Sequence, residues 1–74
     1  MLENDIVLTA FFERYEADLD ATLAGGLASL LELVDGDLWD LIAARSELAP
    51  SVGAPVRSVL EMLRGCTTRP ANSQ

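Results

Sequence analysis

The sequence predicts an all-α fold, a small bundle of four helices. Apolar residues recur every three or four positions through most of the chain, which is the spacing of one helical face. No segment alternates apolar and polar residues as a half-buried strand would. Because 74 residues allow one small core, residues 1–65 are predicted to form a single helical-bundle domain. The polar segment 66–74 is predicted to be a disordered C-terminal tail.

The first predicted helix covers about residues 2–17 and is apolar on two sides. One side carries Leu8, Phe11, Phe12, Tyr15 and Leu19. Leu2, Ile6 and Ala10 fall on the other side. A helix of this kind needs two neighbours, or one neighbour and one partner, to bury both sides.

The second predicted helix covers about residues 21–34, with Asp20 as its N-cap. Its apolar row is Leu23, Leu27, Leu30, Leu31 and Val34. Gly25 and Gly26 weaken this prediction, because each glycine costs about 1 kcal/mol in a helix interior. The glycines indicate either close helix packing or a frayed first turn.

The third predicted helix covers about residues 36–46, with Asp35 as its N-cap. Its apolar face contains Leu38, Leu41 and Ile42, and Trp39 lies at the edge of that face, where its ring would be half buried.

The fourth predicted helix covers about residues 55–65. Pro55 suits a first helical position and Gly65 suits a C-cap. Its inward row is Val56, Val59, Leu60 and Leu63.

The composition excludes several classes of function. The net charge is −7 with five arginines and no lysine cluster, which disfavours binding to nucleic acid or an anionic membrane surface. There is no histidine and a single cysteine, Cys66, so neither imidazole catalysis nor a thiolate metal cluster is expected. A calcium loop starting at Asp35 fails because Asp40 stands where glycine is needed. The expected class of function is therefore binding rather than catalysis.

Three stretches, taken together, point to one known family. They are MLENDIVL followed by FFERYE, then LASLLELVDGDLWDLI, and last VRSVLEMLRG. Their order and spacing over Met1 to Gly65 resemble the succinate dehydrogenase assembly factor family, called SdhE in bacteria. The resemblance implies a five-helix fold. It also implies a non-enzymatic assembly factor that binds the flavoprotein subunit of succinate dehydrogenase or fumarate reductase and promotes covalent FAD attachment.

The resemblance also assigns site residues. The family motif is Arg-Gly-x-x-Glu, usually followed two residues later by Asp. Glu3 matches the motif glutamate and Asp5 the later aspartate, whereas the Arg-Gly and the family's first helix have no counterpart here. The chain is therefore expected to start directly after the Arg-Gly, either because the start codon was assigned at an internal Met or because this form is truncated.

Partner contact is expected at Glu3, Asp5 and Trp39. The simpler alternatives are stabilisation of the carboxylates by the helix dipole and packing of the tryptophan at the core edge.

The expected partner is the flavoprotein subunit, with FAD bound by that client and no cofactor bound by this chain. Direct membrane insertion is not expected, because no apolar run approaches the length of a transmembrane helix. A cytoplasmic bacterial protein is expected. The apolar strip on the first helix would permit self-association. The alternative function is a generic acidic helical adaptor or antitoxin-like module unrelated to flavin.

Overall fold

The computed structural model describes residues 2–67, and these residues form four α-helices, one 3-10 turn and no strand. The α-helices are α1 (Leu2–Tyr15), α2 (Ala21–Leu31), α3 (Asp35–Ile42) and α4 (Ala54–Cys66), and the 3-10 turn η1 covers Glu16–Asp18. The predicted all-α fold is confirmed. Cys66, placed in the tail by the sequence, ends α4 instead, and residues 68–74 of the predicted tail lie outside the described part.

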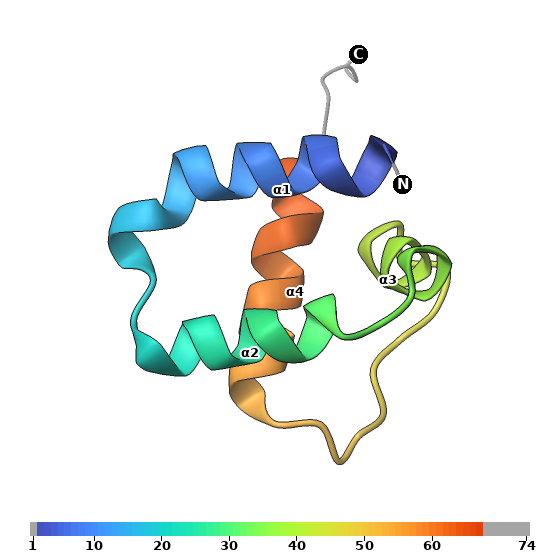
Figure 1. The fold of residues 1–74 in the computed structure, drawn as a ribbon. Helices are drawn as coiled ribbons and strands as arrows, with labels where there is room; N and C mark the ends of the chain where they lie inside the picture. The colour runs from blue at the N-terminus through green and yellow to red at the C-terminus, as the bar shows by residue number, and fades with distance from the viewer. Residues whose placement is uncertain (1, 68–74) are drawn as a thin grey trace.

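The last helix, α4, is the centre of the packing. It contacts α1, α2 and α3, and α1 also contacts α3. Figure 1 shows α4 running between α1 and α2 and crossing both steeply, while α3 lies at the end of the molecule where α1 begins. Helices that follow one another in sequence are therefore joined mainly through α4.

The core is built from one or more apolar residues of every α-helix. It contains Val7, Phe11, Leu27, Leu30, Leu38, Leu41, Ile42, Val59, Leu60 and Leu63. All predicted inward residues of α3 are in this set, whereas three residues predicted to face the core are exposed: Phe12, Leu31 and Val34. Val34 is exposed because α2 ends at Leu31, so Val34 no longer continues the helical row.

Of the two predicted N-caps, Asp20 and Asp35, one is confirmed. The Asp20 carboxylate accepts a hydrogen bond from the Leu23 N–H at 2.8 Å, as an N-cap should. Pro55, predicted to be the first residue of the fourth helix, is the second, because α4 begins at Ala54. The prediction for Asp35 is wrong: Val34, in an extended conformation, is the N-cap of α3 and no side chain caps it. Asp35 is the first helical residue, where it still suits the helix dipole.

Two helix ends also differ from the sequence prediction. The third helix stops at Ile42 rather than near Ser46, because Ala44 has a left-handed backbone with φ of 63°. The fourth helix continues through Gly65, which is therefore not its C-cap, and Thr67 takes that position. The extra helical residue, Cys66, packs against the core.

The two glycines of α2 have different surroundings. A Cβ placed on Gly26 would lie 2.6 Å from the Pro55 carbonyl oxygen, so α2 approaches the start of α4 as closely as backbone allows. A Cβ on Gly25 would meet nothing within 4 Å. Close packing, rather than a frayed first turn, explains Gly26.

Candidate partner-binding surface

The first turns of α1 present two carboxylates beside exposed apolar side chains. Leu2 is 70% exposed and Ile6 is 60% exposed. Glu3 and Asp5 are also exposed and, by helical geometry, lie on opposite flanks of the Leu2–Ile6 stripe. Neither carboxylate has an ion-pair partner among residues 2–67. We call Leu2, Glu3, Asp5 and Ile6 the α1 face.

On the opposite side of the same turns, Asn4 is buried. Asn4 is 2% exposed, and its Nδ2 donates a hydrogen bond to the backbone oxygen of Asp35 at 3.0 Å. Its Oδ1 is buried and accepts no hydrogen bond from the part of the chain that the structure describes. Such an unpaired acceptor costs about 1–3 kcal/mol. The contact fixes the start of α1 against the start of α3.

Sequence reasoning missed Asn4, although a signal existed. Asn4 lies three, four and seven residues before Val7, Leu8 and Phe11. That spacing places it on the core side of α1. A polar residue at a predicted core position indicates a specific hydrogen bond.

Trp39 lies on α3 and is half buried, packed against the core, as expected. It is four residues after Asp35, so the two share one face of α3 about a turn apart. The structure therefore places Trp39 on a different helix from Glu3 and Asp5. The Asn4–Asp35 hydrogen bond joins the two helices.

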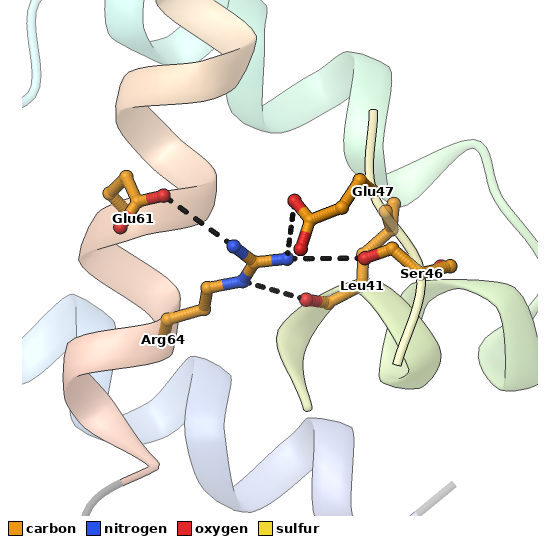
Figure 2. Close-up of polar contacts among 5 residues, drawn as sticks. All are labelled: Leu41, Ser46, Glu47, Glu61 and Arg64. Carbon is orange, nitrogen blue, oxygen red and sulfur yellow. Dashed lines mark hydrogen bonds and ion pairs between the residues drawn. The ribbon is translucent and has the colours of Figure 1, made fainter. Parts of the chain in front are cut away.

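The loop between α3 and α4 is held by two arginines of α4. Arg64 Nε donates to the Leu41 carbonyl oxygen at 2.8 Å, and its Nη2 donates to the Ser46 oxygen at 3.2 Å (Figure 2). The same guanidinium forms ion pairs with Glu47 at 3.2 Å and Glu61 at 3.5 Å. All three nitrogens of the Arg64 guanidinium are thus engaged by its own chain, and the arrangement fixes the loop.

Arg57 fastens an earlier part of α4 to the same loop, donating to the Ala49 and Val52 carbonyl oxygens. Between the arginines lies a shallow depression of about 290 Å³. It is lined by Glu47, Leu48, Arg57, Leu60, Glu61 and Arg64. Because acidic and basic groups alternate there and the arginines bind backbone oxygens, the depression offers no net charge to attract a ligand.

Cys66 is the only cysteine and lies at the end of α4. Burial raises the pKa of its thiol above the ordinary 9.0, and the nearby positive charge of Arg14 opposes this to a lesser extent. A raised pKa keeps the thiol protonated at neutral pH, which lowers its reactivity. Within residues 2–67, no group of acidic or cysteine side chains is placed to hold a metal ion.

Comparison with known proteins identifies the family. Residues 1–66 match the family model described as Flavinator of succinate dehydrogenase. The chain belongs to this family. A curated member named FAD assembly factor SdhE, from Ralstonia nicotianae, is 48% identical over 65 residues, which cover 86% of this chain and 68% of that protein. No solved structure matches the chain.

Membership of the flavinator family confirms the resemblance read from the three sequence stretches. It does not test the roles of Glu3, Asp5 or Trp39, which stay predictions. Among the described helices, none has the length and apolar character needed to span a bilayer.

Proposed function

We propose that this chain binds the flavoprotein subunit of succinate dehydrogenase and promotes the covalent attachment of FAD to it. The support is the match of residues 1–66 to the flavinator family and the name of its relative, an FAD assembly factor. The alternative, an adaptor or antitoxin-like module unrelated to flavin, is not favoured by these comparisons.

The chain acts without catalysing the reaction itself. Its sequence has no histidine, and burial raises the pKa of its one thiol. A protein with this inventory promotes attachment by binding one conformation of the client more tightly than others. The attachment-competent state of the flavoprotein then becomes more populated, to the extent of that difference in affinity.

The observation that carries the location of the site is the α1 face. A helix that buries one side and leaves Leu2 and Ile6 exposed on the other has apolar area available for a partner. The Glu3 and Asp5 carboxylates beside it have no ion-pair partner within residues 2–67, and they favour a partner surface with arginine or lysine side chains, which donate charge-assisted hydrogen bonds. Trp39 adds a half-buried aromatic ring on α3.

The direct test is a flavinylation assay with purified flavoprotein lacking FAD, free FAD and this chain, read by flavin fluorescence of the denatured client. We expect the chain to accelerate covalent attachment. Glu3→Ala should weaken client binding by about 10- to 100-fold, the loss of one hydrogen bond to a charged group. Glu16→Ala, an exposed glutamate in η1 far along the chain, is the matched control. Equal affinities for the Glu3 variant and the wild type would remove Glu3 from the site.

FAD belongs to the client, and this chain binds none by itself. Titration of the isolated chain with FAD, followed by flavin fluorescence, should show no saturable binding. Tight stoichiometric binding would contradict this part of the proposal.

The same apolar surface allows self-association when no client is present. Sedimentation at rising concentration should show a larger species in the wild type, and Ile6→Ser should reduce it. The place of action is the cytoplasm, where a chain with one protonated thiol and no disulfide is stable.

A further inference from the structure

We infer that Asn4 is a positioning residue, which fixes the α1 face relative to α3 and so aligns Glu3 and Asp5 with Trp39 for the client. This inference rests on the proposed function, because the alignment matters only if these side chains meet one partner. Asn4 itself is 2% exposed and is not offered to the client.

The hydrogen bond made by Asn4 joins α1 to α3 next to the side chains proposed to meet the client. Asn4 lies between Glu3 and Asp5 in sequence, so its side chain and their carboxylates share one rigid turn of α1. Its Nδ2 reaches the Asp35 carbonyl oxygen at 3.0 Å, across 31 positions of sequence. The α-helical repeat directs that same oxygen toward the backbone N–H of Trp39, four residues on. One oxygen atom thus links the acidic turn of α1 to the backbone of Trp39.

The unpaired oxygen of Asn4 shows that burial alone does not explain this residue. Oδ1 has no donor among residues 2–67, so the side chain is only half satisfied. The neighbours along its helical row, Val7 and Phe11, are apolar and fully buried. A leucine, which has nearly the same shape as asparagine, would continue that row without leaving a polar atom unpaired. The asparagine is therefore better explained by the orientation that its hydrogen bond gives to α1 than by a gain in folding stability.

A hydrogen bond supplies direction that an apolar contact does not. Its strength falls off steeply with distance and angle, whereas packed apolar side chains tolerate small rotations and slides. Without the Asn4 bond, Val7 and Phe11 still hold α1 in the core, but the first turn of α1 loses its directional contact with α3. A small rotation moves the outward carboxylates of Glu3 and Asp5 relative to Trp39.

The test measures the affinity of the full chain for the FAD-free flavoprotein with Asn4→Leu, Glu3→Ala and the double variant. Ser29→Ala is the matched control, because it also removes one side-chain bond to a backbone oxygen, but within a single helix. We expect Asn4→Leu to weaken client binding by about fivefold or more, the equivalent of one net hydrogen bond. Its melting temperature should equal or exceed that of the wild type. The double variant should lose affinity by a smaller factor than the product of the two single-variant factors, because the two substitutions act on the same contact.

A second readout needs no client. Hydrogen exchange of the free chain should speed up in the first two turns of α1 in Asn4→Leu, while α2 and α4 keep their protection. If Asn4→Leu does not fold, Asn4→Ala removes the same bond and gives the same comparison.

The outcomes separate the two proposals. A flavoprotein that does not bind the wild-type chain overturns the proposed function, and the positioning role with it. Wild-type binding that Asn4→Leu leaves unchanged, or losses that multiply fully with Glu3→Ala, overturn the role of Asn4 alone. A loss of affinity that comes with an equal loss of protection throughout the chain also overturns it, because Asn4 would then be merely structural.

Discussion

The contact between α2 and α4, which includes Gly26 and Pro55 and which we call the seam, differs from the α1 face in how completely the side chains are buried or paired. At the seam, Gly26 meets the Pro55 backbone closely, and the two helices that form it bury Leu30 and Leu63 almost fully in the core. On the α1 face, apolar side chains are exposed and two carboxylates lack ion-pair partners within residues 2–67.

The difference assigns stability and binding to separate parts of a very small molecule. A domain of this size has little stability to lose, so its core contacts must be close to complete. Exposed apolar area contributes little to folding, and the exposed carboxylates contribute only the modest helix-dipole stabilisation of a first turn. Both become more favourable once a complementary partner covers them. Substitutions at the seam should therefore change the melting temperature, and substitutions on the α1 face should change client affinity.

The largest effect should come from emptying the core. Leu63→Ala removes a side chain with 0% exposure and should lower the free energy of unfolding by about 2–5 kcal/mol. Chemical denaturation followed by circular dichroism measures this. The comparison partner is Ile6→Ala on the α1 face, which should change stability by less than about 0.5 kcal/mol. Similar losses of unfolding free energy in both variants would contradict the assignment of stability to the core and of binding to the α1 face.

The glycine pair of α2 gives a sharper contrast within one helix. Gly26→Ala forces the backbones of α2 and α4 apart and should destabilise the chain by about 1–3 kcal/mol. Gly25→Ala has open space around it and should stabilise the helix by up to about 1 kcal/mol. Melting temperatures that move in opposite directions are expected. A stabilising Gly26→Ala would show that the close approach is not tight.

The two arginines near the end of α3 form a third pair. Arg64→Met removes bonds to the Leu41 and Ser46 oxygens and should cost about 1–3 kcal/mol, because Arg64 is only 19% exposed. Arg45→Met breaks an exposed pair with Asp40 and should cost less than about 1 kcal/mol. Thermal melts in low and high salt should show the smaller effect fading with salt.

The smallest effect should come from Cys66. Because burial raises the pKa of its thiol in the folded chain, the folded state holds this proton more tightly than the unfolded state. The resulting stability is complete below the ordinary value of 9.0 and is lost as pH rises through the higher folded value. Melting temperatures from pH 8 upward should fall slightly more steeply for the wild type than for Cys66→Ala. Iodoacetamide should react more slowly with the folded chain than with the denatured one.

Local signals allowed much of the fold to be predicted. The carboxylate of Asp20 and the spacing of Leu38, Leu41 and Ile42 each act within a few residues, and the structure confirms them. Pro55 predicted the start of α4 to within one residue. The packing of α4 against all three other helices depends on contacts between distant residues, which periodicity does not specify.

The wrong predictions have the same origin. Gly65 and the expected cap at Asp35 have the right residue types for helix ends. The observed ends depend instead on Cys66 reaching the core and on the extended backbone of Val34.

The candidate site was predictable in part. The exposure of Leu2 and Ile6 follows from the two-sided pattern of the first helix, and the choice of Glu3 and Asp5 came from the family resemblance. The buried bond of Asn4 to Asp35 joins residues 31 apart, so no local pattern named its partner.

The central claim, that binding is centred on the α1 face and not on the packed body, is tested most directly by a hydrogen-exchange footprint of the flavoprotein complex. Backbone amides of residues 2–12 should gain protection when the FAD-free flavoprotein binds, with a smaller gain around Trp39 and none in the α2–α4 seam. A footprint centred on α2 or on the depression beside Arg64, with residues 2–12 unchanged, would contradict the account.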